Sequence, residues 1–244
     1  MRIVWLALVA VGCSREPIMI HHRIVAHRGA SFEAPGNTLA AFRRAWELGA
    51  EAVELDVRLS KDGHVVVFHD ATTKRIGAER AVAEQSLAEL RTLDANIPTL
   101  AEALAIMPAG RTTHVEIKSG PETAPAIARV IRAATPRGAH VVLQGYDAAA
   151  LGALARELPG ATAFWDIDPP KDQPYPLTIV DDAKRHGFGG LALDVRGVTD
   201  ELVVAARAAN ILVDIWTLND RALIQHWLAR DVRWIETDRP DLAP

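Results

Sequence analysis

The 244-residue chain contains a single cysteine, Cys13, so no disulfide can form within it. It has no excess of positive charge either, because 27 Lys and Arg residues stand against 31 Asp and Glu and give a formal net charge of −4. A protein that binds nucleic acid needs a stripe of clustered Lys and Arg, so the composition argues against a nucleic-acid partner. With 49% hydrophobic and 24% charged residues, the chain is otherwise typical of a globular protein.

The apolar run at the N-terminus, residues 3–11, is too short to cross a membrane as a helix, which takes about 20 residues. It has the length of the apolar region of a signal peptide, and Met1-Arg2 places a positive charge before it. Cys13 follows small residues, and this segment resembles the lipobox of bacterial lipoproteins, in which the cysteine is lipidated. We therefore expect a signal segment at residues 1–13, a tether at 14–22 and the folded domain at 23–244. The resemblance implies export to the bacterial cell envelope, either into the periplasm or anchored to a membrane through Cys13. Without a working signal the protein would be cytoplasmic.

From Arg23 onward, short β-branched runs alternate with amphipathic stretches of helix length, which indicates a parallel sheet. The predicted strands are Arg23–Ala26, Ala52–Val57, Thr113–Ile117, His140–Gln144, Ala161–Trp165, Gly190–Leu193, Ile211–Ile215 and Arg233–Glu236. Helices are predicted at Thr38–Leu48, Ala124–Ala134, Ala148–Glu157, Asp200–Ala209 and Arg221–Ala229.

Eight strands, most of them followed by a helix, predict a single-domain α/β fold of the (β/α)₈ TIM-barrel type. The competing fold is a doubly wound open sheet, but no Gly-x-Gly-x-x-Gly motif follows the first strand. An extended segment at Val65–Phe68 follows the second strand, and residues 72–110 have a helical pattern. We interpret residues 72–110 as a small helical insertion into the barrel.

Two predicted strands carry charge on one face and aliphatic residues on the other. Glu54 and Asp56 alternate with aliphatic residues in the second strand, and Glu116 and Lys118 do the same at the third. Buried carboxylates need a compensating charge, and three that converge from two strands favour a divalent cation. A salt bridge with Arg58 or Lys118 is the alternative.

In barrels of this type the active site lies at the carboxyl ends of the strands, where these residues fall. Oxygen ligands without a Cys or His cluster suit one hard cation, Ca²⁺ or Mg²⁺. Two cationic side chains beside such a site, Arg28 and Lys118, suit a phosphate between them and the metal. His27 and His69 then provide an acid and a base. Together these features indicate phosphodiester cleavage.

The motifs in this order resemble the signature of glycerophosphodiester phosphodiesterases, from Ile24 to Pro240. They are His27-Arg28-Gly29-Ala30, Ala34-Pro35-x-Asn37-Thr38, Glu54-x-Asp56-Val57, Asp62-Gly63, His69-Asp70, Ile97-Pro98-Thr99-Leu100, Val115-Glu116-Ile117-Lys118, Trp216-Thr217-x-Asn219 and Thr237-Asp238-x-Pro240.

The resemblance implies a metal-dependent (β/α)₈ barrel that hydrolyses glycerophosphodiesters to sn-glycerol 3-phosphate and an alcohol through a cyclic phosphate. It implies that His27 and His69 are the acid/base pair and that Glu54, Asp56 and Glu116 are the metal ligands. It also implies that Arg28 and Lys118 hold the phosphate and that Trp216 forms the wall on the glycerol side. Gln144 ends the fourth strand and is a further candidate for substrate binding, whereas His114, His140 and His226 belong to no recognisable constellation.

Three departures from the family pattern leave the preferred leaving alcohol undetermined. They are Gly36 where Glu is usual, a shorter chain between Leu93 and Ile97, and Gly145-Tyr146 where Ser-Phe is common. One alternative is a lipid phosphodiesterase of the lysophospholipase D or sphingomyelinase D type on the same barrel. Another is an inactive barrel that binds phosphate or polyols. The sequence leaves the cation, the leaving alcohol, the first-acting histidine and the oligomeric state undetermined.

Overall fold

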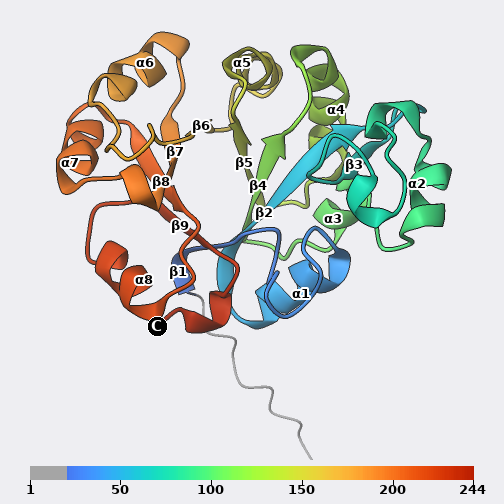
Figure 1. The fold of residues 1–244 in the computed structure, drawn as a ribbon, viewed down its shortest axis with the longest axis horizontal. Coiled ribbons are helices and arrows are strands. Elements are labelled where there is room, and N and C mark those ends of the chain that lie inside the picture. The colour runs from blue at the N-terminus through green and yellow to red at the C-terminus, as the bar shows by residue number, and fades with distance from the viewer. Residues whose placement is uncertain (1–20) are drawn as a thin grey trace, which may run out of the picture.

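The computed structural model describes residues 21–244, and in this part of the chain eight parallel strands close into a barrel (Figure 1). Each strand pairs with the next around the ring, and β1 pairs with both β2 and β9, so the ring has no open edge. The strands are β1 (His21–Ala26), β2 (Ala50–Leu59), β4 (Thr112–Ile117), β5 (His140–Gly145), β6 (Ala163–Ile167), β7 (Gly190–Asp194), β8 (Leu212–Trp216) and β9 (Trp234–Thr237). The predicted (β/α)₈ barrel is confirmed.

Helices surround the strands on the outside of the barrel (Figure 1). They are α1 (Leu39–Glu47), α2 (Leu87–Leu93), α3 (Leu100–Ala105), α4 (Ala124–Ala134), α5 (Ala148–Glu157), α6 (Thr178–His186), α7 (Asp200–Ala208) and α8 (Arg221–Leu228). Short 3₁₀ helices are η1 (Lys74–Ile76), η2 (Val82–Glu84), η3 (Pro121–Thr123), η4 (Val195–Gly197) and η5 (Pro240–Leu242). The first barrel helix begins after Thr38, whose hydroxyl accepts the N–H of Ala41 at 3.2 Å as an N-cap.

The predicted insertion, residues 72–110, contains two different parts. Strand β3 (Val65–Val67) pairs antiparallel with β2, and η1, η2 and α2 pack around it over a small apolar cluster that includes Phe68 and Leu90. Helix α3, in contrast, packs between α1 and α4 and takes the place of a barrel helix. The insertion is therefore smaller than predicted, because a helical pattern does not distinguish a barrel helix from an added one.

Several element bounds differ from the prediction by a few residues, and one helix was not predicted. Strand β1, for example, begins at His21 rather than at Arg23. Helix α6 was not predicted although Ile179, Val180 and Ala183 form a buried stripe along it, because its other residues are polar or charged and the segment as a whole is hydrophilic. The predicted signal segment, 1–13, and residues 14–20 of the predicted tether lie outside the described residues.

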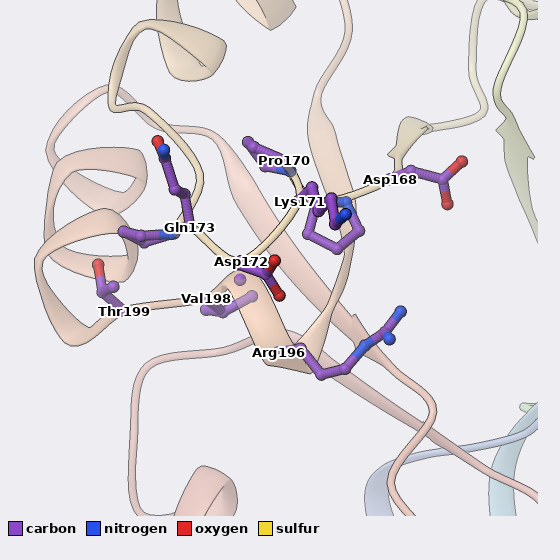
Figure 2. A pocket seen from close by; sticks show the side chains of 11 residues that line it. Asp168, Pro170, Lys171, Asp172, Gln173, Arg196, Val198 and Thr199 are labelled. Carbon is purple, nitrogen blue, oxygen red and sulfur yellow. The ribbon is translucent and has the colours of Figure 1, made fainter.

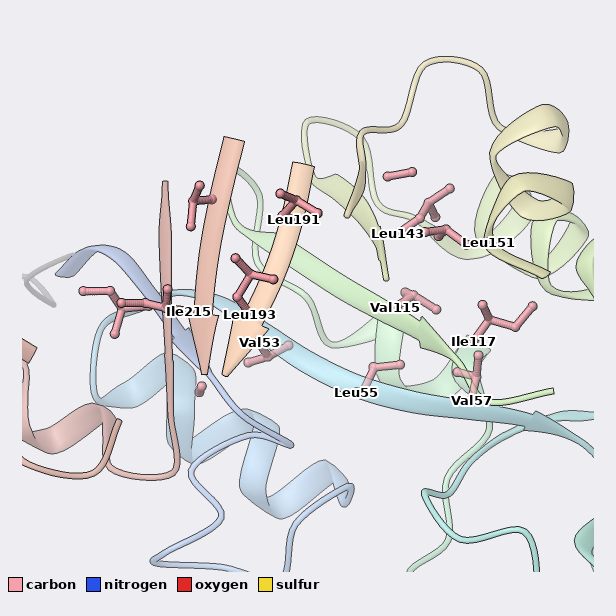
Figure 3. Close-up of a cluster of buried hydrophobic side chains, with 14 of the residues drawn as sticks. Val53, Leu55, Val57, Val115, Ile117, Leu143, Leu151, Leu191, Leu193 and Ile215 are labelled. Carbon is pink, nitrogen blue, oxygen red and sulfur yellow. The ribbon is translucent and has the colours of Figure 1, made fainter. Parts of the chain in front are cut away.

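The main apolar core fills the space between the strands and the helices (Figure 3). Alternate residues of β2, such as Val53, Leu55 and Val57, point outward into this core. A second apolar cluster is made of the inward side chains Val25, Ala52, Val142, Phe164, Ala192 and Trp234. These residues form an apolar layer inside the barrel, toward the amino ends of the strands, and the polar inward residues follow it along the strands.

Leu151→Ala tests the outer core, since Leu151 lies on α5 and is fully buried. We expect a loss of about 2–5 kcal/mol in the free energy of unfolding, from lost transfer energy and the cavity that remains. Leu223→Ala on α8 is the control, because Leu223 is 46% exposed and its loss should change stability by at most about 0.5 kcal/mol. Urea unfolding measures both values, and equal midpoints for the two variants would contradict this packing.

Among residues 21–244, every helix is too short or too polar to cross a membrane.

Candidate active site

Three carboxylates meet inside the barrel toward the carboxyl ends of β2 and β4. Asp56 pairs in register with Glu116, and Glu54 lies one inward position lower on β2. All three are buried, and one oxygen from each lies within 4.8 Å of the others. The predicted convergence of Glu54, Asp56 and Glu116 is therefore present.

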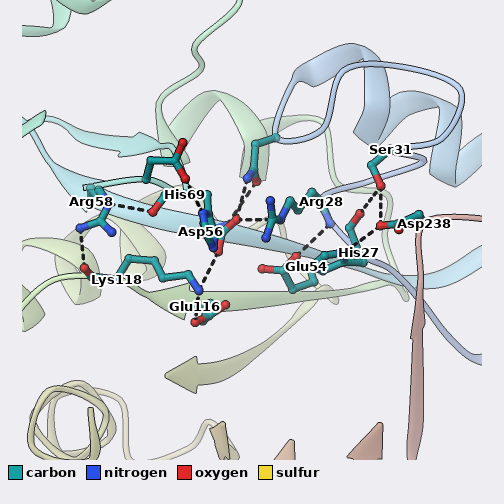
Figure 4. A network of polar contacts seen from close by, with 12 residues as sticks. His27, Arg28, Ser31, Glu54, Asp56, Arg58, His69, Glu116, Lys118 and Asp238 are labelled. Carbon is teal, nitrogen blue, oxygen red and sulfur yellow. Dashed lines mark hydrogen bonds and ion pairs between the residues drawn. The ribbon is translucent and has the colours of Figure 1, made fainter. Parts of the chain in front are cut away.

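Two cations balance part of this negative charge (Figure 4). The Lys118 ammonium lies 3.3 Å from Oδ1 of Asp56 and 2.5 Å from Oε1 of Glu116. Nε of Arg28 lies 3.3 Å from Oδ2 of Asp56, and the Arg28 backbone N–H donates to Oε2 of Glu54 at 2.9 Å. Arg58 instead donates to the backbone carbonyls of two residues at the rim, His69 and Lys118, at 2.9 and 2.6 Å.

The three carboxyls differ in how strongly they are ionised. Burial and the nearby charge of Asp56 raise the pKa of Glu54 well above its usual value and that of Glu116 to about 8. Burial opposes ionisation of Asp56 too, but the charges of Lys118 and Arg28 outweigh it and lower the pKa of Asp56. Two cations do not balance three ionised carboxylates, so a further positive charge would stabilise the ionised forms.

The same group fits a bound divalent cation. Oε1 of Glu54, Oδ1 of Asp56 and Oε1 of Glu116 are buried and accept no hydrogen bond, although the last two are in ion-pair range of Lys118. Buried carboxylate oxygens without donors are costly unless a cation compensates them. All-oxygen ligation suits Mg²⁺ or Ca²⁺.

The two predicted catalytic histidines are each oriented by an aspartate. Nδ1 of His27 lies 2.8 Å from Oδ1 of Asp238, and Nδ1 of His69 lies 2.7 Å from Oδ1 of Asp70. A carboxylate at Nδ1 fixes the tautomer and leaves Nε2 to exchange protons. Burial lowers the pKa of His69, although Asp56 and Asp70 act in the opposite direction.

Asp238 is itself held in place. Ser31 donates to its Oδ1 at 2.8 Å and Asn219 to its Oδ2 at 2.6 Å. Burial opposes its ionisation, but these donors and His27 lower the pKa of Asp238 to about 2. No role was predicted for Asp238, although it stands within one of the motifs that carry the family resemblance.

A cavity of about 160 Å³ joins most of the predicted site residues. Among its lining residues are His27, Arg28, His69, Glu116, Lys118, Gln144 and Trp216. A larger cavity of about 780 Å³ lies between the loop after β6 and the loop after β7 (Figure 2). Its walls include Lys171, Asp172 and Arg196 and none of the predicted site residues, so the smaller cavity is the candidate active site.

The other two residues predicted to bind substrate differ in how strongly polar contacts hold their side chains. Trp216 lies at the rim, where its ring meets Tyr146 edge to face with centroids 6.2 Å apart. Gln144 lines the cavity, but it donates to Glu236 at 2.8 Å and its Oε1 lies 3.1 Å from Nδ1 of His114. The prediction that His114 belongs to no constellation is therefore wrong.

Cys13, the predicted lipidation site, lies outside the residues that the structure describes.

A family model described as the glycerophosphoryl diester phosphodiesterase family matches residues 27–242. A glycerophosphodiester phosphodiesterase from Caldanaerobacter subterraneus subsp. tengcongensis is 44% identical over 40% of this chain, and the aligned part spans 45% of that relative. The crystal structure of a glycerophosphodiester phosphodiesterase from Thermotoga maritima is 28% identical, with a TM-score of 0.75, over 91% of this chain and 96% of that one. A phosphodiesterase from Oleispira antarctica, solved in complex with the product sn-glycerol-3-phosphate, is 26% identical with a TM-score of 0.81 and covers 90% and 94%.

Proposed function

The chain belongs to the glycerophosphoryl diester phosphodiesterase family, and on that premise we propose that it hydrolyses glycerophosphodiesters to sn-glycerol 3-phosphate and an alcohol. The observation that carries the proposal is the small cavity lined by His27 and His69, each with a carboxylate at Nδ1, above three buried carboxylates. Acid, base, phosphate grip and cation site then surround one reacting phosphorus. The product bound to the Oleispira antarctica relative supports the same assignment.

In the proposed reaction, Arg28 and Lys118 bind the phosphate oxygens, with Arg28 as a planar donor and Lys118 as a point charge. One histidine removes the proton of the glycerol 2-hydroxyl, whose oxygen attacks phosphorus, while the other donates a proton to the departing alcohol oxygen. The resulting cyclic phosphate is opened by water with the two roles exchanged. Each histidine thus ends the cycle in its starting protonation state.

Glu54, Asp56 and Glu116 would hold the divalent cation, Mg²⁺ or Ca²⁺, through their unpartnered oxygens. When bound, such a cation stabilises negative charge on the phosphate oxygens and acidifies a nearby hydroxyl. Lys118 contacts two of these ligands and so couples the phosphate grip to the cation site.

The test is product analysis with glycerophosphocholine and with an analogue that lacks the glycerol 2-hydroxyl. The proposal predicts sn-glycerol 3-phosphate from glycerophosphocholine and no cleavage of the analogue. Cleavage of both compounds at similar rates would exclude a reaction through the cyclic phosphate. Failure with both, in folded protein supplied with Mg²⁺ or Ca²⁺, would count against the proposed activity.

One observation favours the lysolipid alternative. The ring of Phe32 is 65% exposed and lines a second cavity, of about 420 Å³, together with His27, Arg28 and Arg75. An exposed aromatic side chain beside the site suits an acyl chain or a lipid surface. Turnover of lysophosphatidylcholine faster than of glycerophosphocholine would favour this alternative.

Asp238→Asn should lower kcat by about 10²–10⁴-fold with little change in KM, because an amide at this position favours the wrong tautomer of His27. Asp241→Asn is the control, since Asp241 lies nearby and pairs with Arg239 at the surface. Steady-state kinetics of both variants provide the measurement. An Asp238→Asn enzyme with normal kcat would show that the carboxylate does not position His27.

We also propose that residues 1–13 direct export and that Cys13 is lipidated, on the strength of the lipobox-like sequence. Incorporation of labelled fatty acid into the full chain in a bacterial host, and its loss in Cys13→Ser, is the expected result. Equal labelling of the two proteins, or none in either, would contradict this assignment.

A further inference from the structure

A second cluster of ionisable residues lies inside the barrel, away from the three carboxylates of the candidate active site. His114 on β4, Asp214 on β8 and Glu236 on β9 point inward from strands that are far apart in the sequence. One ligand atom from each lies within 4.8 Å of the others. His114 and Asp214 are 0% exposed and Glu236 is 3% exposed, so water does not compensate their charge.

The spacing of these atoms suits a shared ion. Nδ1 of His114 lies 3.4 Å from Oδ2 of Asp214 and 3.7 Å from Oε1 of Glu236, both longer than a good hydrogen bond, and it lies within hydrogen-bond range of Oε1 of Gln144, at 3.1 Å. Four ligands that bind a tetrahedral ion at about 2.0–2.1 Å lie about 3.3–3.4 Å from one another. The three separations from Nδ1 of His114 lie on both sides of that value.

Hydrogen bonds do not satisfy every buried polar atom of this cluster. Both carboxylate oxygens of Asp214 and Nε2 of His114 are buried without a hydrogen-bond partner. Within residues 21–244, Asp214 and Glu236 form ion pairs with His114 and with no Lys or Arg. Burial and the charge of Glu236 raise the pKa of Asp214 to about 8, so both buried carboxylates can be ionised beside a single imidazole only if further positive charge is bound.

We propose that His114, Asp214 and Glu236, with Oε1 of Gln144 as the fourth ligand, form a second metal site that holds a structural divalent transition ion such as Zn²⁺. One imidazole and two carboxylates suit such an ion better than Mg²⁺ or Ca²⁺, which prefer the all-oxygen site above it. The Gln144 amide also donates to Glu236, the kind of contact that orients metal ligands.

The position of the site indicates its role. The ring of His114 packs against Phe164 and Trp234, which belong to the apolar layer inside the barrel. The four ligands come from β4, β5, β8 and β9, so one ion would tie together four strands across the interior. Because the ligands are buried, the ion enters during folding and then exchanges slowly.

The test is the metal content of the full chain, refolded with Zn²⁺ and excess Mg²⁺ and then desalted. We expect about one tightly held Zn²⁺ per chain, and a content at least about tenfold lower for Asp214→Asn. Glu54→Gln, in the all-oxygen site, and Asp166→Asn, a buried carboxylate on neighbouring β6, should both keep their Zn²⁺. Equal Zn²⁺ in wild type and Asp214→Asn would overturn the proposal.

A second measurement covers the case in which Asp214→Asn does not fold. Crystals of the Zn²⁺-refolded wild type should show an anomalous peak at the zinc edge between His114, Asp214 and Glu236. The alternative is an imidazolium ion pair. Burial lowers the pKa of His114, but the hydrogen bonds and charges of Asp214 and Glu236 outweigh it and raise that pKa to about 9. A protonated His114 in nitrogen NMR of the zinc-treated protein, with no anomalous peak, would overturn the site.

Discussion

His69→Ala should lower kcat for glycerophosphodiester hydrolysis by about 10²–10⁴-fold, the usual contribution of a general acid or base. The ring is held by Asp70 at Nδ1 and lines the cavity that also contains His27, so in the proposed reaction Nε2 would exchange protons with the substrate. Substrate affinity should change less, because Arg28 and Lys118 still bind the phosphate. Release of glycerol 3-phosphate from glycerophosphocholine at saturating substrate provides the measurement.

The matched control is His64→Ala. His64 lies in the turn before β3, half exposed, and its polar contacts are with the nearby Asp62 and Ser60. Its loss should leave kcat within about twofold of wild type, since surface substitutions of this kind have small effects. If His69→Ala retains near-normal turnover, the acid/base role is wrong.

Glu54→Gln should lower kcat/KM by about 10³-fold, which corresponds to about 4 kcal/mol of lost transition-state stabilisation. Glutamine keeps the size of Glu54 and can still accept the Arg28 N–H, so the change removes mainly a charged metal ligand. The cation concentration for half-maximal activity should rise in parallel. Activity measured across a series of Mg²⁺ or Ca²⁺ concentrations separates this effect from a simple loss of folding.

Glu47→Gln is the corresponding control, because Glu47 lies at the exposed end of α1 and pairs with Arg44. It should match wild type in both activity and cation dependence. A Glu54→Gln enzyme with the cation dependence of wild type would mean that Glu54 is not a ligand.

Several features of the fold and site follow from local sequence. The alternation of charged and aliphatic residues in β2 predicted which side chains point inward, and the structure confirms that Glu54, Asp56 and Glu116 converge. The bounds of α4 and α5 were also predicted, because both helices carry a clear apolar stripe.

Other features depend on contacts that no short segment encodes. His114, Asp214 and Glu236 are each unremarkable in their own strands, and only closure of the barrel brings the inward side chain of β4 close to those of β8 and β9, which are not its neighbours in the sheet. The partnership of His27 with Asp238 likewise joins residues 211 positions apart. Helix α6 was missed because its segment is hydrophilic as a whole, although its three buried residues follow a helical spacing.

Release of sn-glycerol 3-phosphate from glycerophosphocholine should be followed before EDTA treatment, after it, and after Mg²⁺ or Ca²⁺ is restored. If two histidines act on a phosphate beside a cation held by Glu54, Asp56 and Glu116, EDTA should abolish release and one of the two cations should restore it. Release at the full rate in EDTA would contradict this mechanism, because the three carboxylates would then have no cation to hold in the reaction.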